Sequence, residues 1–89
     1  MRFVFTKHAL KRFKDFRNYG VKIARQQVIK TIQKPDHVDK KSDSPKIIVS
    51  KIRDETHILR VVFKIESDII VIITFYPAKR GRYYENKKN

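Results

Sequence analysis

The stretch His57–Tyr76, HILRVVFKIESDIIVIITFY, decides the fold of this 89-residue chain. Its two runs, 57–66 and 69–76, are rich in β-branched and aromatic residues, as strands are. Only Ser67-Asp68 separates them, and a two-residue linker of this type predicts a β-hairpin. In the first run alternate positions starting at His57 form an apolar set, which we assign to the core face. The second run is apolar on both faces and therefore predicts a central strand.

Two further strands are expected outside this hairpin. Lys46–Arg53 (KIIVSKIR) has the same composition, so residues 46–76 predict a three-stranded antiparallel sheet. Met1–Phe5 (MRFVF) is short, apolar and β-prone, and predicts a fourth strand. The segment 35–45 is polar and bounded by prolines at both ends, so we interpret it as a loop.

The chain between the first strand and this loop has helical periodicity. Apolar residues recur every three or four positions in Lys7–Arg17, with Thr6 as the N-cap and Gly20 as the stop signal. The same spacing continues from Lys22 to Gln33, where Pro35 ends the pattern. Residues 7–34 therefore predict a helical hairpin.

The expected element order is β-α-α-β-β-β, an α+β fold in which the helical hairpin packs on one face of a mostly antiparallel four-stranded sheet. We expect a single domain, 1–89, whose last part, 77–89, is a basic tail. A chain this short buries only about 60–65% of its unfolded surface. A deep cofactor cleft between two domains is excluded, and any active site lies in a surface groove.

Several functional classes are disfavoured by residue type. Cysteine is absent, and the histidines His8, His37 and His57 lie far apart in the sequence, so we expect no metal site. No phosphate-binding loop, dinucleotide glycine pattern or nucleophile elbow is present, and we expect no cofactor. No run approaches the ~20 apolar residues of a membrane span, and no signal-peptide core is seen. The sequence predicts a cytoplasmic protein without a membrane partner.

The charge is strongly unbalanced. Twenty-two Lys and Arg against nine Asp and Glu give +13, and the excess lies in residues 1–34 (+9) and 77–89 (+4). A surface adapted only for solubility or heat would carry Glu in rough balance with the basic residues. If the fold joins the two ends, one face is cationic and suits a polyanion such as nucleic acid.

Basic and aromatic residues of this kind can cleave RNA without a metal. The reaction needs a base for the 2′-hydroxyl proton, cations for the phosphorane and an acid for the 5′-oxygen. Tyrosines beside arginines also stack on exposed bases. The tail supplies such side chains in Lys79, Arg80, Arg82, Tyr83 and Tyr84. The alternative is a solvated tail whose tyrosines pack on the sheet edge.

Two further positions are candidates. Arg60 interrupts an apolar strand, which is costly unless the guanidinium is paired, for instance with Glu66 or Glu85, or faces a wet groove and a substrate phosphate. His8 is the acid–base candidate by residue type, because histidine titrates nearest to neutral pH. A surface histidine without a function is the alternative for His8.

These residues together resemble the RelE/ParE superfamily of toxin–antitoxin toxins, especially its BrnT-like branch. The resemblance rests on Lys7-His8-Ala9 after a short strand, on ILRVVFKIE leading into IIVIITFYPAKRGRYYE, and on the tail order Ala-Lys-Arg, Arg, Tyr. It implies a RelE-like fold whose sheet cradles RNA. It also implies an mRNA endonuclease, with or without the ribosome, that a cognate antitoxin of acidic character inhibits.

The resemblance also suggests roles for individual residues. Arg60 corresponds to the family's strand arginine on the scissile phosphate, Arg80 or Arg82 to its C-terminal arginine, and Tyr84 to its terminal tyrosine. Lys7 and His8 correspond to the Lys-His pair of the BrnT-like branch. The expected site thus has catalytic and RNA-binding parts. The catalytic candidates are Arg60, Lys79, Arg80, Arg82, Tyr84 and His8, and the RNA-binding candidates are Lys7, Lys11, Arg12 and Tyr83.

The acid and base stay open between His8 and Lys79, because this tail lacks the C-terminal histidine of several family members. The competing hypothesis is a non-catalytic module on the same fold that binds nucleic acid or protein, including a ParE-type toxin directed at gyrase.

Overall fold

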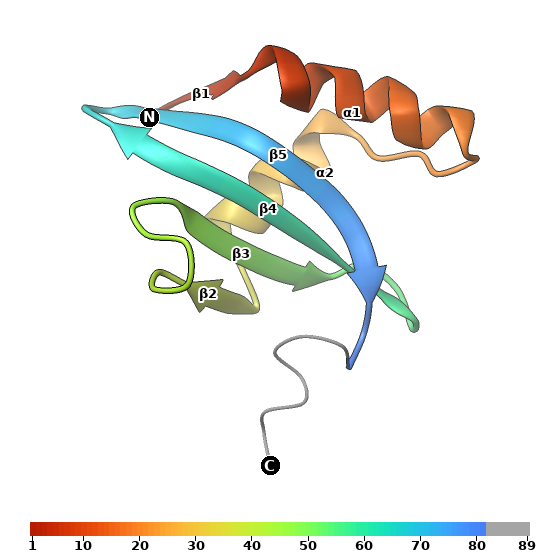
Figure 1. Ribbon diagram of the computed structural model, residues 1–89. Coiled ribbons are helices and arrows are strands. Elements are labelled where there is room, and N and C mark those ends of the chain that lie inside the picture. Colours follow the sequence, from red (N-terminus) through yellow and green to blue (C-terminus); the bar gives the residue numbers. More distant parts are fainter. Residues whose placement is uncertain (82–89) are drawn as a thin grey trace.

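The predicted hairpin forms the centre of the sheet. In the computed structural model, which describes residues 1–81, β4 (His57–Glu66) and β5 (Ile69–Lys79) pair antiparallel across the Ser67-Asp68 turn (Figure 1). Ser67 has a φ of 57°, the left-handed conformation that tight hairpin turns require. β4 pairs on its other side with β3 (Ile47–Ile52). The three-stranded antiparallel unit is therefore as expected.

The full sheet has five strands in the order β1-β5-β4-β3-β2. β1 (Arg2–Phe5) runs parallel to β5 and leads into α1 (Lys7–Asn18), and all other strand pairs are antiparallel. α2 is Arg25–Gln33 and β2 is His37–Asp39. The predicted class, α+β with two helices against a mostly antiparallel sheet, is confirmed.

The prediction of four strands was wrong, because β2 lies inside the segment interpreted as a loop. β2 has three residues, too few for an alternating pattern to be visible in the sequence. Tertiary bonds from its neighbour position it: Asp36 N donates to Ser50 O at 2.8 Å, and Asp36 Oδ2 accepts from Ile52 N at 2.7 Å. A strand this short is defined by its partner rather than by its own composition.

β5 continues to Lys79, three residues beyond its predicted end at Tyr76, and includes Pro77. β1 pairs with β5 only as far as Ile72, and within residues 1–81 no other strand pairs with that edge of β5 beyond it. A proline, which cannot donate to the sheet, is tolerated at such an edge.

The helix boundaries are set by capping groups. Thr6 caps α1 as predicted: its Oγ1 accepts from Ala9 N and donates to Ile73 O, both at 3.1 Å. Ile73 is the extra residue of a bulge in β5, so this hydroxyl joins helix and sheet. α2 begins at Arg25 rather than Lys22, because Gln27 Oε1 reaches back to Ala24 N at 2.7 Å and marks the first turn.

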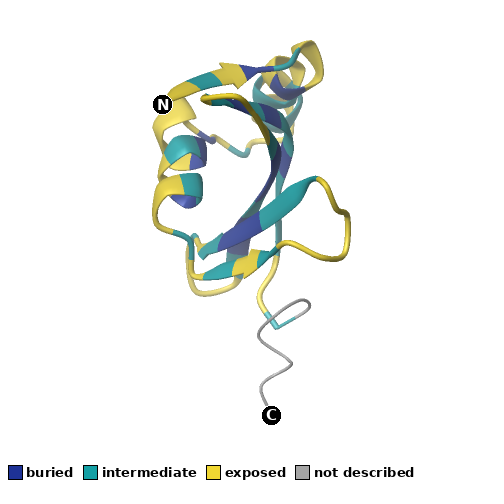
Figure 2. Cartoon of the chain, turned by 90° about the vertical axis from the view of Figure 1, so that its left-hand side faces the viewer, coloured by how far each residue is buried: buried dark blue, intermediate teal, exposed yellow. Residues whose placement is uncertain are grey.

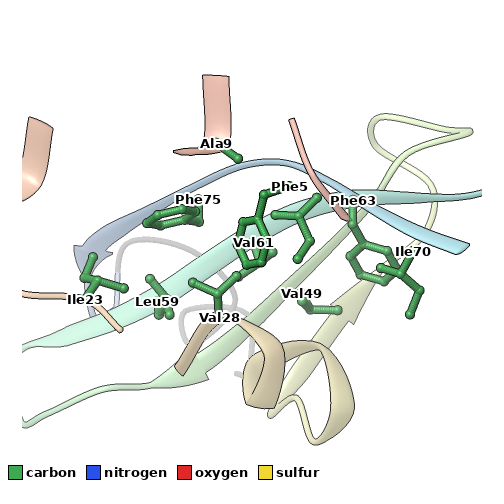
Figure 3. Packing of buried hydrophobic residues seen from close by; sticks show 11 residues of the cluster. Phe5, Ala9, Ile23, Val28, Val49, Leu59, Val61, Phe63, Ile70 and Phe75 are labelled. Carbon is green, nitrogen blue, oxygen red and sulfur yellow. The ribbon is translucent and has the colours of Figure 1, made fainter. Parts of the chain in front are cut away.

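The core lies between the helices and the inner face of the sheet, the face turned toward them (Figure 3). The Phe13 and Phe75 rings, from α1 and β5, lie 4.6 Å apart. The alternation predicted for β4 holds in the middle of the strand, where Leu59, Val61 and Phe63 are buried. Ile65, expected in the core, is half exposed, because α1 starts beside Ile72 and runs away from the hairpin turn.

The remaining strand side chains lie on the outer face, the face that neither helix covers. Successive strand residues point to opposite faces, so the register of the sheet determines which side chains share this face. In Figure 2 the buried residues follow the sheet and the sides of the helices that face it, whereas loops and outer helix surfaces are exposed. No helix within residues 1–81 is long and apolar enough to cross a membrane.

Candidate functional site

Four polar side chains form a line across the outer face, one from each of four neighbouring strands. The register pairs His37 of β2 with Ser50 of β3, Ser50 with Arg60 of β4, and Arg60 with Tyr76 of β5. Directly paired residues point to the same face, so these four side chains stand side by side. We call His37, Ser50, Arg60 and Tyr76 the polar row.

Arg60 is held in place by Tyr76. Its Nε donates to Tyr76 Oη at 3.0 Å, and its guanidinium carbon lies 5.8 Å from the centre of the same ring. Its neighbours on this face, Ile58 and Val62, are only 1% and 9% exposed. The cation is therefore positioned in apolar surroundings, where its interaction with an anion is stronger than in water.

One of the two carboxylates predicted as alternative partners of Arg60, Glu66, is engaged elsewhere. Glu66 pairs with Lys64, whose Nζ lies 2.8 Å from Glu66 Oε2. Glu85 lies outside the described residues. The hydrogen bond to the Tyr76 phenol fixes the direction of the Arg60 guanidinium.

Ser50 is the most enclosed member of the polar row. Its side chain is 1% exposed, and within residues 1–81 its Oγ has no hydrogen-bond partner. A buried hydroxyl without a partner costs about 1–3 kcal/mol. Such a group next to a positioned arginine is a feature that folding alone does not favour.

His37 shares the outer face with Asp39, two positions further along β2. Asp39 Oδ1 accepts from Lys41 N and from Ser42 N, each at 3.0 Å. The Ser42 hydrogen bonds lower the pKa of Asp39 to about 2, with smaller contributions from the Lys41 amide and from nearby His37. The Asp39 carboxylate therefore stays ionised beside the imidazole throughout the physiological range.

Lys79 and Arg80 lie at the end of β5 beyond the polar row. Arg80 N donates to Thr56 O at 2.9 Å, and its Nη1 contacts Glu55 O at 3.5 Å, so the β3–β4 turn positions this arginine. Lys79 pairs in register with His57. Lys79 lies three positions beyond Tyr76, about 10 Å along a strand. Arg82, Tyr83 and Tyr84, the other predicted tail residues, lie outside the described residues.

His57 belongs to a separate arrangement in the β3–β4 turn. Its Nδ1 lies 2.8 Å from Thr56 Oγ1 and 3.3 Å from Asp54 Oδ1. Hydrogen bonds from the amides of Thr56 and His57 lower the pKa of Asp54. His57 lies three positions before Arg60 on β4, an odd spacing, so its side chain points to the inner side, away from the polar row.

The predicted residues of the first helix are not brought to Arg60. Lys7, His8 and Lys11 are exposed on α1, which packs against the inner face. Lys11 Nζ pairs with Asp15 at 3.2 Å, and the Arg12 guanidinium stacks on Phe16 at 4.8 Å from the ring centre. The described cations of α1 therefore lie on the helical layer, whereas Arg60 lies on the outer face of the sheet.

Sequence reasoning missed His37 and Ser50 as candidate residues. His37 was not identified as a candidate, because the segment that contains β2 was interpreted as a loop. Ser50 carries no distinguishing signal, since a serine in a strand is ordinary. Arg60 was visible as a charged residue in an apolar strand, whereas Tyr76 is the last residue of a run that was predicted to be apolar on both faces. Within residues 1–81, no group of three or more His, Asp or Glu side chains is placed to hold a metal ion.

Comparison with known families places this α+β chain in one of them. Residues 5–77 match the family described as a domain of unknown function, DUF4258, and the chain belongs to that family. The match spans the polar row and ends before Lys79. No curated protein and no solved structure matches the chain.

Proposed function

We propose that the protein is a metal-independent endoribonuclease, the toxin of a toxin–antitoxin pair, and that the polar row binds the scissile phosphate. The observation that carries this proposal is the Arg60 guanidinium, positioned by Tyr76 at the centre of the outer face of a chain with a net charge of +13. A preorganised cation in apolar surroundings is the group that stabilises a phosphorane most effectively.

The surrounding cations extend this centre to a longer RNA. Arg80 follows the end of β5, is held there by the β3–β4 turn and contacts a flanking phosphate. Lys79 pairs in register with His57, so its side chain points to the inner side of the strand. Among the residues outside the described part of the chain, Arg82 binds RNA phosphates and Tyr83 and Tyr84 stack on unpaired bases. No metal or cofactor enters the reaction.

The resemblance to RelE/ParE toxins supports this function through the arginine-bearing strand and the tail sequence. The partner is mRNA, free or on the ribosome, and an acidic antitoxin neutralises the cationic toxin. The α+β class, with two helices packed against a mostly antiparallel sheet, is compatible with this resemblance.

A second function is favoured by one specific observation, the hydrogen bond between Arg60 and Tyr76. The same bond gives Arg60 a structural role and allows a module that binds nucleic acid or a protein such as gyrase without cleaving RNA. Fold alone does not separate these functions. They differ in turnover and in the response to substitution at Arg60.

The test is controlled expression in a host without the antitoxin, with RNA 5′ ends mapped when growth slows. We expect growth arrest and new 5′ ends with the wild type. In vitro, cleavage by the purified protein should persist in EDTA and produce 2′,3′-cyclic phosphate ends. Arg60→Ala should lower the cleavage rate by about 10²–10³-fold, the usual effect of losing a group that stabilises the transition state.

Lys64→Ala is the matched control, because Lys64 lies four residues along the same strand on the same face and is paired with Glu66. It should change the rate only a few-fold. Arrest without new RNA ends contradicts the nuclease and indicates a protein target. RNA binding without arrest or cleavage indicates the non-catalytic module.

A further inference from the structure

The polar row places one histidine beside the positioned arginine. His37 and Arg60 stand on either side of Ser50, two strand spacings apart, which is roughly 10 Å between their backbones. Both side chains stand on the outer face with Ser50 between them, and Tyr76 holds the Arg60 guanidinium from the other side. The separation of His37 and Arg60 is suited to a phosphate with its two ester oxygens.

The hydroxyl between them is the second observation. Ser50 Oγ is enclosed and has no partner among residues 1–81, although it lies beside two polar side chains of the same row. A phosphate oxygen within hydrogen-bond distance would accept from this hydroxyl and recover the cost of its burial. Because the hydroxyl is enclosed, the side chains around it must move aside when the phosphate binds. The polar row thus offers a cation, a hydroxyl and an imidazole in sequence to one anionic group.

The other two histidines are placed differently. His8 lies in the first turn of α1, on the layer that packs against the inner face. His57 points to the inner side, and its Nδ1 contacts Thr56 Oγ1 in the turn. Of the three histidines, all of which the structure describes, only His37 shares a face and a register row with Arg60.

We propose that His37 is the general acid of RNA cleavage and that Ser50 and Arg60 bind the scissile phosphate beside it. The 2′-oxygen attacks phosphorus and its proton passes to solvent water. The bond between phosphorus and the 5′-oxygen breaks, and the departing oxygen takes a proton from the His37 imidazolium. The products are a 2′,3′-cyclic phosphate and a 5′-hydroxyl, and water reprotonates the imidazole. This inference rests on the proposed nuclease function.

The role of an acid is tested by changing the leaving group. An RNA whose scissile 5′-oxygen is replaced by sulfur departs as a thiolate, which needs no proton donor. The experiment compares this RNA with ordinary RNA of the same sequence, placed on ribosomes if the wild type cuts only there. His37→Gln should slow cleavage of ordinary RNA by about 10²–10⁴-fold. With the sulfur-containing RNA, the same variant should retain activity within about tenfold of the wild type.

Arg60→Ala is the control, because losing the phosphate-binding cation slows both substrates. RNA binding and urea unfolding of His37→Gln should match the wild type. Equal slowing of both substrates by His37→Gln overturns the acid role and indicates a positioning role. Full activity of His37→Gln on ordinary RNA overturns any catalytic role. A wild type that binds both RNAs and cleaves neither overturns the nuclease function itself, and the acid with it.

Discussion

At Ser50 the requirements of folding and of ligand binding conflict. A serine at a position 1% exposed, without a hydrogen-bond partner among residues 1–81, lowers stability relative to a small apolar side chain. Its counterpart on α2, Thr31, is equally buried, but its Oγ1 donates to Gln27 O at 2.7 Å. The two hydroxyls therefore differ in partners rather than in burial.

Ser50→Ala should raise the free energy of unfolding by about 1 kcal/mol, because it removes a buried group that costs energy when unpaired. Thr31→Val, which removes a bonded hydroxyl, should lower it by a similar amount. Urea unfolding of both variants measures the difference. If Ser50→Ala is as destabilising as Thr31→Val, the Ser50 hydroxyl has a partner in solution and its proposed place in phosphate binding loses support.

At the scale of elements, the β2–β3 connection shows how one carboxylate holds a short strand. Asp39 ends β2 and accepts from the amides of Lys41 and Ser42. The pKa of Asp39 falls from 3.8 to about 2 because these donors favour the ionised form. A depressed folded-state pKa contributes stability above the unfolded value, and that contribution is lost as the pH falls through the folded value.

The wild type should therefore lose stability as the pH falls from about 4 to about 2, and Asp39→Asn should flatten this part of the profile. The amide oxygen of asparagine can keep the backbone hydrogen bonds but does not titrate. Asp68→Asn, in the β4–β5 turn, removes the same charge and serves as the control. Urea unfolding at several pH values gives the comparison, and identical slopes for Asp39→Asn and the wild type would contradict the assignment.

At the scale of the molecule, the positive charge is divided between two layers. The cations of α1 lie on the helical layer, whereas Arg60 and Lys64 lie on the outer face of the sheet. The proposed function uses the outer face, together with Arg80 beyond the end of β5. The affinity for RNA should therefore depend more on the charges of the outer face than on those of the helical layer.

Binding of single-stranded RNA should weaken linearly in log affinity against log salt, with a slope of about −0.7 for each phosphate neutralised. Arg80→Ala should reduce the magnitude of that slope by about 0.7. Lys7→Ala/Lys11→Ala, a double substitution on α1, should leave it unchanged. Fluorescence anisotropy across a salt series measures all three slopes. A larger change of slope in the double variant than in Arg80→Ala would place RNA on the helical layer. That layer carries Lys7, Lys11 and Arg12, which the sequence predicts as RNA-binding residues.

The sequence alone determined the hairpin of β4 and β5, the Thr6 cap and the α+β class, because periodicity, capping and turn chemistry act between residues close in the chain. Arg60 was visible for the same reason, as a charge in an apolar run. Only the tertiary structure decided that His37 and Ser50 join Arg60, because three-residue β2 is defined by bonds to a distant strand. It also separated the cations of α1 from that row, since pairing across a sheet and packing on one of its faces depend on contacts that no local pattern encodes.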